Sequence, residues 1–219
     1  EFYEQDIPAD DDRRRIVGRT QLGNPSQIYS LDWLPSLNLI YNLRTNEENP
    51  FNLRVNYFRS LARPAFREIS FVRLFDYEFQ APVAGNIDLQ IAEVNNYDLR
   101  LENYLPNGNN ISVSLFYKDF INHIELTQIE GGNGPLTWQN APRSFATGAE
   151  FEVLVRLNES LEFRTNLSLI YSETTVTDTS TNSSDTRPMF GQAPWIVNAM
   201  LNYNVEKIRL NASVSYNVQ

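Results

Sequence analysis

Alternation of apolar and polar residues with a period of two constrains the fold of this chain more than any other feature. In residues 51–57 every odd-numbered position is apolar, and every position between is Asn or Arg. Successive side chains of a β-strand point to opposite faces, so this segment has one face suited to hydrocarbon and one suited to water. The pattern predicts an amphipathic β-strand.

The same alternation recurs along most of the chain, and no helical periodicity competes with it. Seven further segments carry it: 37–44, 96–102, 111–118, 149–157, 161–171, 195–203 and 207–216. We therefore predict an all-β protein.

The connections between these segments alternate between short and long. Short ones are predicted at 45–50, 106–110, 158–160 and 205–206, and long ones at 61–94, 126–144 and 172–192. If the strands run simply up and down, all short turns lie at one end and all long loops at the other, as in outer-membrane barrels. A Greek-key sandwich has no reason to sort its loops in this way. The spacing predicts an antiparallel up-and-down transmembrane β-barrel segment of about eight strands.

Strand length and aromatic placement agree with a membrane-spanning sheet. A strand of about 11 residues, rising roughly 3.4 Å per residue and tilted by roughly 40°, reaches about 29 Å along the membrane normal. Without a run of 18 apolar residues, a transmembrane helix is not expected. Aromatic residues near strand ends fit an interfacial girdle, although sheets favour aromatics in general. They are Tyr41, Tyr57, Tyr97, Tyr104, Tyr117, Tyr171, Trp195, Tyr203 and Tyr216.

Charge and cysteine content narrow the possible partners. The net charge of -9 argues against nucleic acid, because phosphate binding requires clustered Lys and Arg. Much of the acidity lies near the start, where Asp10, Asp11 and Asp12 favour a solvated loop over a divalent-ion site, since adjacent carboxylates lack the alternate spacing of calcium loops. The absence of cysteine excludes disulfides, thiolate metal sites and cysteine nucleophiles within these residues.

The sequence gives little support for a catalytic site. The only histidine, His123, is interpreted as exposed at the barrel rim, because no nucleophile motif or orienting carboxylate marks it. Glu150 and Glu152 share one strand face, and a lumen-lining role balanced by Arg156 and Arg164 is favoured over acid–base catalysis. The glycine-rich residues 131–134 indicate a turn and not a phosphate cradle. We predict no enzyme, catalytic residue, cofactor or metal site.

A polar solute is the expected ligand, because the polar strand face offers Asn, Ser, Arg and Glu groups. The pair Arg63 and Pro64 is interpreted as a strand exit set by proline and not as a ligand contact. The Ser- and Thr-rich residues 172–186 favour a hydrated loop over a sugar site. Deletion of 126–144 is expected to reduce uptake or ligand affinity if that loop captures ligand. The ligand-binding residues themselves stay unknown.

Eight short motifs in order resemble the C-terminal half of TonB-dependent outer-membrane receptors. They are residues 34–39, 52–57, 61–68, 85–89, 96–100, 113–120, 148–152 and 187–194, with departures at Leu61 and Ile87. The resemblance implies part of a 22-stranded barrel in the outer membrane of a Gram-negative bacterium. It also implies a plug domain, a TonB-type energy-coupling complex that acts on the plug, and import of iron chelates, cobalamin or oligosaccharides.

On this basis, residues 1–219 form a partial receptor barrel domain with the plug absent. Residues 1–33 are expected to be mainly loop, and 34–219 to be strands with short periplasmic turns and long extracellular loops. The opening at Glu1, without methionine or a signal sequence, favours an internal fragment. Two alternatives remain. A self-contained eight-stranded outer-membrane protein would pair its first strand with its last, and a soluble carbohydrate-binding β-sandwich would pack two sheets face to face.

Overall fold

The fold is a single curved antiparallel sheet. A computed structural model of the whole chain describes residues 31–46, 49–70, 72–128, 135–178 and 183–219. Eight long strands follow one another across the sheet in chain order. They are β1 (Ser36–Arg44), β2 (Phe51–Ala62), β5 (Ala92–Leu105), β6 (Asn109–Gln128), β7 (Leu136–Asn158), β8 (Leu161–Asp178), β10 (Trp195–Val205) and β11 (Leu210–Val218). The predicted all-β class and the eight-strand meander are confirmed.

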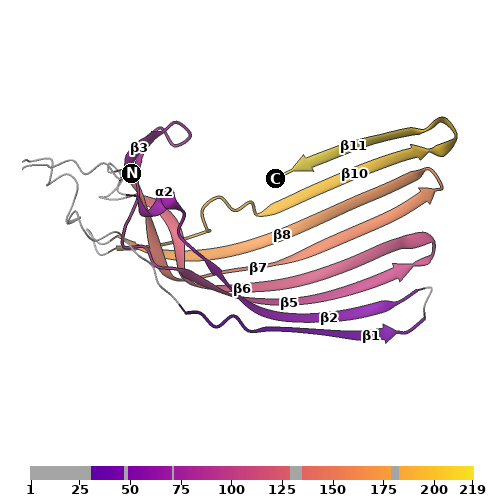
Figure 1. Cartoon of the computed structure of the whole chain (residues 1–219), viewed down its shortest axis with the longest axis horizontal. Helices are drawn as coiled ribbons and strands as arrows, with labels where there is room; N and C mark the ends of the chain where they lie inside the picture. The colour runs from indigo at the N-terminus through magenta and orange to yellow at the C-terminus, as the bar shows by residue number, and fades with distance from the viewer. Residues whose placement is uncertain (1–30, 47–48, 71, 129–134, 179–182) are drawn as a thin grey trace, which may run out of the picture.

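Short turns join the strands at one end of the sheet, which we call the turn end (Figure 1). The β1–β2 and β7–β8 connections have the predicted positions, and the β5–β6 turn contains η1 (Pro106–Gly108). Positive φ angles at Asn107 and Gly108 allow that chain reversal. The β10–β11 turn is longer than predicted, because η2 (Glu206–Ile208) and Arg209 precede β11.

At the opposite end, which we call the loop end, the predicted long connections are shorter than expected. Strands β6 and β7 continue through most of the predicted 126–144 connection and remain paired as far as Gln128 and Leu136. Residues 172–192 likewise contain the end of β8 and a further strand, β9 (Ser183–Arg187), which pairs with β8. Interpreting these two connections as long loops was wrong, because the strands extend well past the alternating segments.

The third connection has its own structure. It contains α2 (Phe66–Ile69), β3 (Arg73–Asp76) and β4 (Ala81–Ala84), and β3 and β4 form an antiparallel pair. Strand β4 also adds in parallel to the extended part of β7, with Val83 opposite Leu136. This connection is therefore anchored to the loop end of the main sheet. Among the described residues, no helix is long and apolar enough to cross a membrane.

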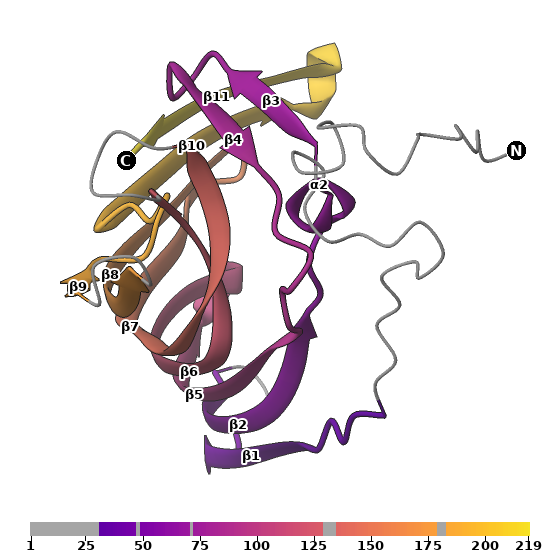
Figure 2. The same ribbon diagram turned by 90° about the vertical axis from the view of Figure 1, so that its left-hand side faces the viewer.

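Seen along the strands, the sheet is an open arc (Figure 2). Strands β1 and β11 form its two edges, and each of them pairs with a neighbour on one side only. A closed eight-stranded barrel requires these two strands to pair with each other, so this chain does not adopt that alternative. All described strands belong to one sheet, and the two packed sheets of a β-sandwich are not formed either.

The apolar face carries a row of aromatic rings towards the loop end. The rings lie on five adjacent strands, and neighbouring ring centroids are 5.1 to 6.2 Å apart. The members are Tyr57, Tyr97, Tyr117, Phe145 and Tyr171. One step closer to the loop end, the same face becomes polar at Arg59, Asn95 and Asp119. Arg143 donates two hydrogen bonds to Asp119, of 3.0 and 3.2 Å. The aromatic row thus marks a sharp boundary between apolar and charged surface.

Candidate functional site

A chain of alternating charges crosses the polar face of four neighbouring strands. Arg54 on β2 donates to Glu102 on β5 at 2.6 Å, and Arg100 donates to the other oxygen of Glu102 at 2.8 Å. Arg100 also holds Glu152 on β7 through two hydrogen bonds of 3.1 and 2.7 Å. Such a two-pronged contact is geometrically specific to arginine. The order of charges is positive, negative, positive, negative.

Strand register and two serines of β6 bring these groups together. Arg54 lies opposite Arg100, and Ser112 lies between Glu102 and Glu152 in the sheet. The hydroxyls of Ser112 and Ser114 each accept from Arg100 at 2.9 Å, and Ser112 donates to Glu152 at 3.2 Å. The short serines leave room for the guanidinium to cross β6. The Glu102 side chain is only 9% exposed, and two arginines contact it, as a buried carboxylate requires.

The predicted partners of the two β7 glutamates need correction. Glu152 is balanced by Arg100 and not by Arg156 or Arg164. Those two arginines contact Glu162 instead, at 3.4 and 2.8 Å. A correct assignment requires the register between β5 and β7, which residue spacing within one strand does not provide.

The charge chain borders a cavity of about 640 Å³. Ionisable side chains of Asp98, Lys118 and Glu150 line it together with the rings of Phe116 and Phe120. The side chains of Asp98 and Glu150 make no hydrogen bond or ion pair with any other residue in the described part of the chain, and the Lys118 ammonium group only approaches the Phe116 ring, at 5.9 Å.

Two amide oxygens in this cavity also have no partner. They belong to Asn56 and Gln192, and both are buried among described residues without a hydrogen bond. Buried polar atoms without partners are costly, and groups that bind a ligand or another segment are a common reason for them. We call this cavity, with its free carboxylates, ammonium group and amide oxygens, the inner cavity.

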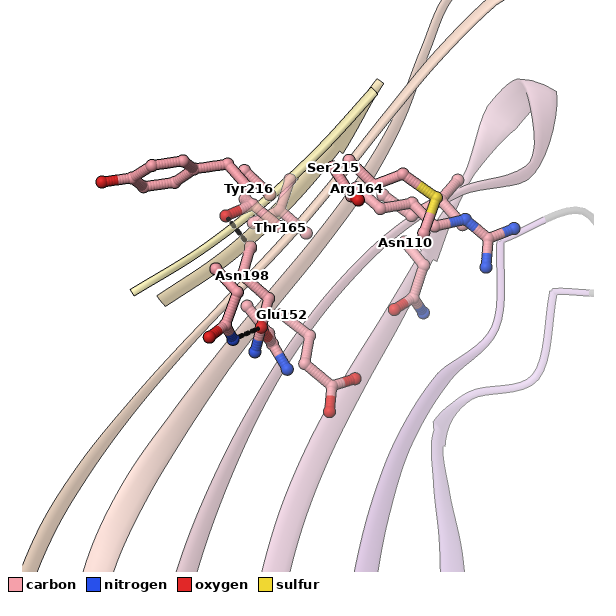
Figure 3. Close-up of a pocket in the computed structure, with 13 residues that line it drawn as sticks. Asn110, Glu152, Arg164, Thr165, Asn198, Ser215 and Tyr216 are labelled. Carbon is pink, nitrogen blue, oxygen red and sulfur yellow. Dashed lines mark hydrogen bonds between the residues drawn. The ribbon is translucent and has the colours of Figure 1, made fainter. Parts of the chain in front are cut away.

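A second hollow of about 500 Å³ lies closer to the turn end (Figure 3). It receives Asn110, Glu152, Arg164, Asn198 and Ser215 from five strands. The Asn217 side chain donates to the Asn198 side chain, and the Thr165 hydroxyl donates to the Asn198 carbonyl at 2.9 Å. This hollow extends the polar lining but holds fewer unpaired charges.

His123 lies inside β6 and not at an exposed rim. Its side chain is 21% exposed and its Nε2 is 3.1 Å from Glu125, while the Phe120 ring contacts it edge-on. The change of position comes from Asn122, which has a φ of 55° and no pairing partner on β7. The register with β7 is the same on both sides of Asn122, from the pair Ile121–Arg143 to the pair His123–Ala141. The positive φ is thus a local change of backbone conformation and not a β-bulge, and beyond it His123 lines the inner cavity.

The structure places the remaining predicted residues as follows. Pro64 is the second residue after β2, which ends at Ala62, as expected of a proline at a strand exit. Asp10, Asp11, Asp12 and the glycines at 131–134 lie outside the described residues. Within the described ranges, no group of three or more metal-ligating side chains is found.

The comparisons with known proteins agree on one protein family. The model of the "TonB dependent receptor-like, beta-barrel" family matches residues 5–219. No curated protein sequence matches the chain.

Three solved structures share the fold. The siderophore receptor PirA from Pseudomonas aeruginosa is 22% identical, with a TM-score of 0.57 over 86% of this chain and 32% of its own. A mutant of the ferric enterobactin receptor PfeA from Pseudomonas aeruginosa is 19% identical, with a TM-score of 0.55 over 85% of this chain and 27% of its own. The copper transporter OprC is 13% identical, with a TM-score of 0.55 over 84% of this chain and 25% of its own.

The chain therefore spans about a third or less of each of these structures. Receptors of the matched family are transport proteins of the Gram-negative outer membrane and not enzymes. The family match extends over nearly the whole sequence. This chain belongs to the TonB-dependent receptor β-barrel family.

Proposed function

We propose that this chain forms part of the barrel wall of an energised outer-membrane receptor that imports a polar ligand. The short turns then face the periplasm and the loop end faces outside. A plug domain, encoded outside these residues, fills the lumen and connects the receptor to a TonB-type complex in the inner membrane. The ligand is an iron chelate, cobalamin or an oligosaccharide.

The inner cavity is the observation that carries this proposal. Its lining offers two free carboxylates, an ammonium group and two amide oxygens without partners in the described chain. A wall with a purely structural role would pair such groups among themselves, as the neighbouring chain from Arg54 to Glu152 does. Free groups of both signs suit a polar ligand, or a polar plug segment that the ligand displaces.

The two-sided character of the sheet supports the membrane location. Its apolar face exposes large side chains such as Leu99, Leu115 and Leu169 to the surroundings. Soluble proteins rarely expose a contiguous apolar surface of this extent. An aromatic row followed by charged residues is the arrangement expected where a barrel leaves the hydrocarbon for the headgroup region.

An iron chelate is our first choice of ligand. Two of the compared structures are a siderophore receptor and a ferric enterobactin receptor. At such low sequence identity, the similarity shows a shared fold and not a shared ligand. The third compared structure is a copper transporter, which also favours a ligand that contains a metal. The alternatives, cobalamin and oligosaccharides, are tested in the same experiment.

The test is an uptake assay with the full-length protein in cells that lack their own receptors. The probes are ⁵⁵Fe-labelled ferric enterobactin, labelled cyanocobalamin and a labelled maltodextrin, each supplied to cells with and without TonB. We expect TonB-dependent uptake of one probe. Uptake that is independent of TonB, or no uptake of any probe, would contradict the proposed function.

The role of the inner cavity is tested in the same cells with the double variant Asp98→Asn and Glu150→Gln. Loss of both charges should reduce uptake by about tenfold, as expected when two polar contacts to a ligand are weakened. The control is Glu206→Gln, which removes a carboxylate from the exposed η2 turn. Equal uptake by the double variant and the control would exclude this cavity from the transport path.

A further inference from the structure

A small hollow lies on the apolar face of the sheet, at the loop-end side of the aromatic row. It has a volume of about 180 Å³. The charged side chains of Asp119, Arg143 and Glu173 line it, together with the rings of Tyr117 and Phe145. We call it the boundary hollow, because these two rings belong both to it and to the aromatic row. The apolar surface therefore leads directly into a charged recess.

Strand register places the charged residues of the boundary hollow on one face. Asp119 on β6 lies opposite Phe145 on β7, and Phe145 lies opposite Glu173 on β8. Residues that lie directly opposite each other in neighbouring strands share a face. Arg143 lies two positions from Phe145 on β7 and so shares it too. All three charged side chains thus belong to the apolar face and not to the polar face that carries the inner cavity.

Asp119 orients the Arg143 guanidinium without using all of its donors. The Nε and Nη2 groups donate to the two carboxylate oxygens at 3.0 and 3.2 Å. The Asp119 side chain is 12% exposed and the Arg143 side chain 76%. Nη1 makes no hydrogen bond with any residue that the structure describes. An oriented, exposed guanidinium with N–H donors left over suits a phosphate group.

Glu173 has no cationic partner in the described part of the chain. Its carboxylate accepts a hydrogen bond from the Tyr171 hydroxyl at 3.1 Å, but it makes no ion pair with Arg143, although both line the same hollow. Two carboxylates against one guanidinium leave the boundary hollow negative overall. A lipid with only a negative phosphate is therefore not complementary to it. A headgroup with an ammonium group beside the phosphate matches both the spare guanidinium donors and the free carboxylate.

The surroundings of the hollow require an amphiphilic occupant. On the other side of the aromatic row, Leu115 on β6 and Leu169 on β8 are 51% and 46% exposed. A molecule whose head fills the hollow would place its tail across the rings and onto these leucines. A water-soluble zwitterion would leave the same apolar surface uncovered. Charge and shape together thus favour a lipid.

We propose that the boundary hollow binds the headgroup of a lipid that carries a phosphate beside a primary ammonium group, as phosphatidylethanolamine does. The phosphate accepts hydrogen bonds from Arg143, the ammonium group donates to Glu173, and the acyl chains lie along the apolar face. Both contacts lie at the edge of the hydrocarbon, where charges interact more strongly than in bulk water. The inference rests on the proposed membrane location and does not depend on import.

The test measures which lipid lies next to the boundary hollow in a bilayer. Leu169, four positions before Glu173 on the same strand face, is replaced in the full-length protein by Leu169→Cys and labelled with bimane, a fluorophore that brominated acyl chains quench. The protein without the introduced cysteine gives the background. Phosphatidylcholine vesicles with the protein receive brominated phosphatidylethanolamine or brominated phosphatidylglycerol, which has a phosphate but no ammonium group. EDTA prevents divalent cations from bridging phosphate and carboxylate.

Phosphatidylethanolamine should reach half of the maximal quenching at a two- to fourfold lower fraction than phosphatidylglycerol, about the range expected of one exposed charge contact. Glu173→Gln should abolish this difference, because it removes the partner of the ammonium group. Arg143→Gln should lower the preference for phosphatidylethanolamine over brominated diacylglycerol, which has no phosphate. Because Arg143→Gln leaves the buried Asp119 without its partner, Glu173→Gln decides the matter if that variant does not fold.

The matched control is Glu93→Gln. Glu93 lies on β5, on the same face and at the same end of the sheet, but it contacts Arg59 at 3.2 Å and lies outside the boundary hollow. Its substitution should leave the lipid preference unchanged. Equal quenching by the two lipids in the parent, a preference that persists in Glu173→Gln, or an equal loss in Glu93→Gln would overturn the proposal.

The outcome also separates this inference from the proposed function. A protein that does not enter the vesicles would contradict the proposed membrane location, and the lipid site with it. A protein that enters them without a preference for phosphatidylethanolamine would contradict the lipid site alone. Failure of the uptake assay by itself would contradict the proposed import and leave the lipid site intact.

Discussion

At the scale of single residues, the polar face contains two kinds of charged group. Arg54, Arg100, Glu102 and Glu152 satisfy one another, and the resulting network holds β2, β5 and β7 in register. Asp98, Glu150 and Lys118 remain available in the inner cavity. The sequence identified Glu150 and Glu152 as lining residues, but only the register across strands distinguishes the free carboxylate from the paired one.

Arg100 is the residue on which the network depends. Arg100→Ala leaves Glu102 and Glu152 with fewer partners and should lower the free energy of unfolding by about 2–3 kcal/mol. Arg100→Lys should recover only part of this, because an ammonium group cannot make the two-pronged contact. Urea unfolding of the full-length protein in detergent measures the loss. Arg73→Ala, at an exposed position on β3, is the control, and an equal loss there would contradict the role of the network.

Asp76 predicts a dependence on pH in the β3–β4 hairpin. The Arg67 guanidinium donates to its carboxylate at 2.8 Å and, with the N–H of Glu78, holds the pKa of Asp76 below the ordinary value of 3.8. A lowered folded-state pKa means that the contribution to stability is present at neutral pH and is lost as the pH falls through that lowered pKa. At neutral pH, Asp76→Asn should exchange its hairpin amides with deuterium faster than the parent.

At acid pH below the pKa of Asp76, the parent and Asp76→Asn should exchange equally. Comparison of the two proteins at the same pH removes the intrinsic pH dependence of exchange. A difference that persists in acid would show that the carboxylate stabilises the hairpin in some other way.

At the scale of elements, the sequence predicted the strands wherever one face is apolar and the other polar. It missed the outer parts of β6 and β7, since Asn122 interrupts the alternation of apolar and polar residues. It missed β9 for a related reason, because Ser183–Arg187 contains only polar residues. Pairing with β8, and not hydrophobic patterning, makes this segment a strand.

The inner cavity could not be predicted from the sequence either, since its lining comes from five separate strands and a connection.

The backbone conformation at Asn122, where φ is 55°, should be essential to the loop end. Deletion of this residue shifts His123 and Glu125 by one position in their pairing with β7 and turns both side chains towards the opposite face. Glu125 then loses Arg187 and the N–H of Phe190, so the Phe190 segment should detach and become sensitive to protease. Asn122→Gly keeps the residue count and tolerates a positive φ, and it should remain resistant. Equal cleavage of the two variants would show that the backbone conformation at Asn122 does not position Glu125.

At the scale of the whole molecule, the open arc and its apolar face require surroundings that these residues do not supply. Strand β1 is exposed along its whole length, and β11 along nearly all of it. Unpaired strand edges and exposed apolar faces are unfavourable in water. Further barrel strands would pair with the free edges of β1 and β11, and lipid would cover the apolar face. This is the arrangement that we propose.

Two leucines with the same exposure test whether the apolar face contacts lipid. Leu115 lies on β6 in the apolar band, Leu74 lies on β3 at the loop end, and each is 51% exposed. Leu115→Arg should reduce stability by about 2–4 kcal/mol if it faces the bilayer interior, and Leu74→Arg should have little effect. The fraction of heat-modifiable, folded receptor in isolated outer membranes measures this. Equal effects of the two substitutions would exclude lipid at Leu115.

The central claim is that these 219 residues are one part of a large outer-membrane barrel. The most direct test is the mass of the native polypeptide in detergent-extracted outer membranes, detected with an antibody raised against this segment. Since 86% and 85% of this chain match 32% and 27% of two receptors with the same fold, we expect a band roughly three times heavier than 25.3 kDa, confined to the outer membrane. A band at 25.3 kDa, or one in the soluble fraction, would contradict the account.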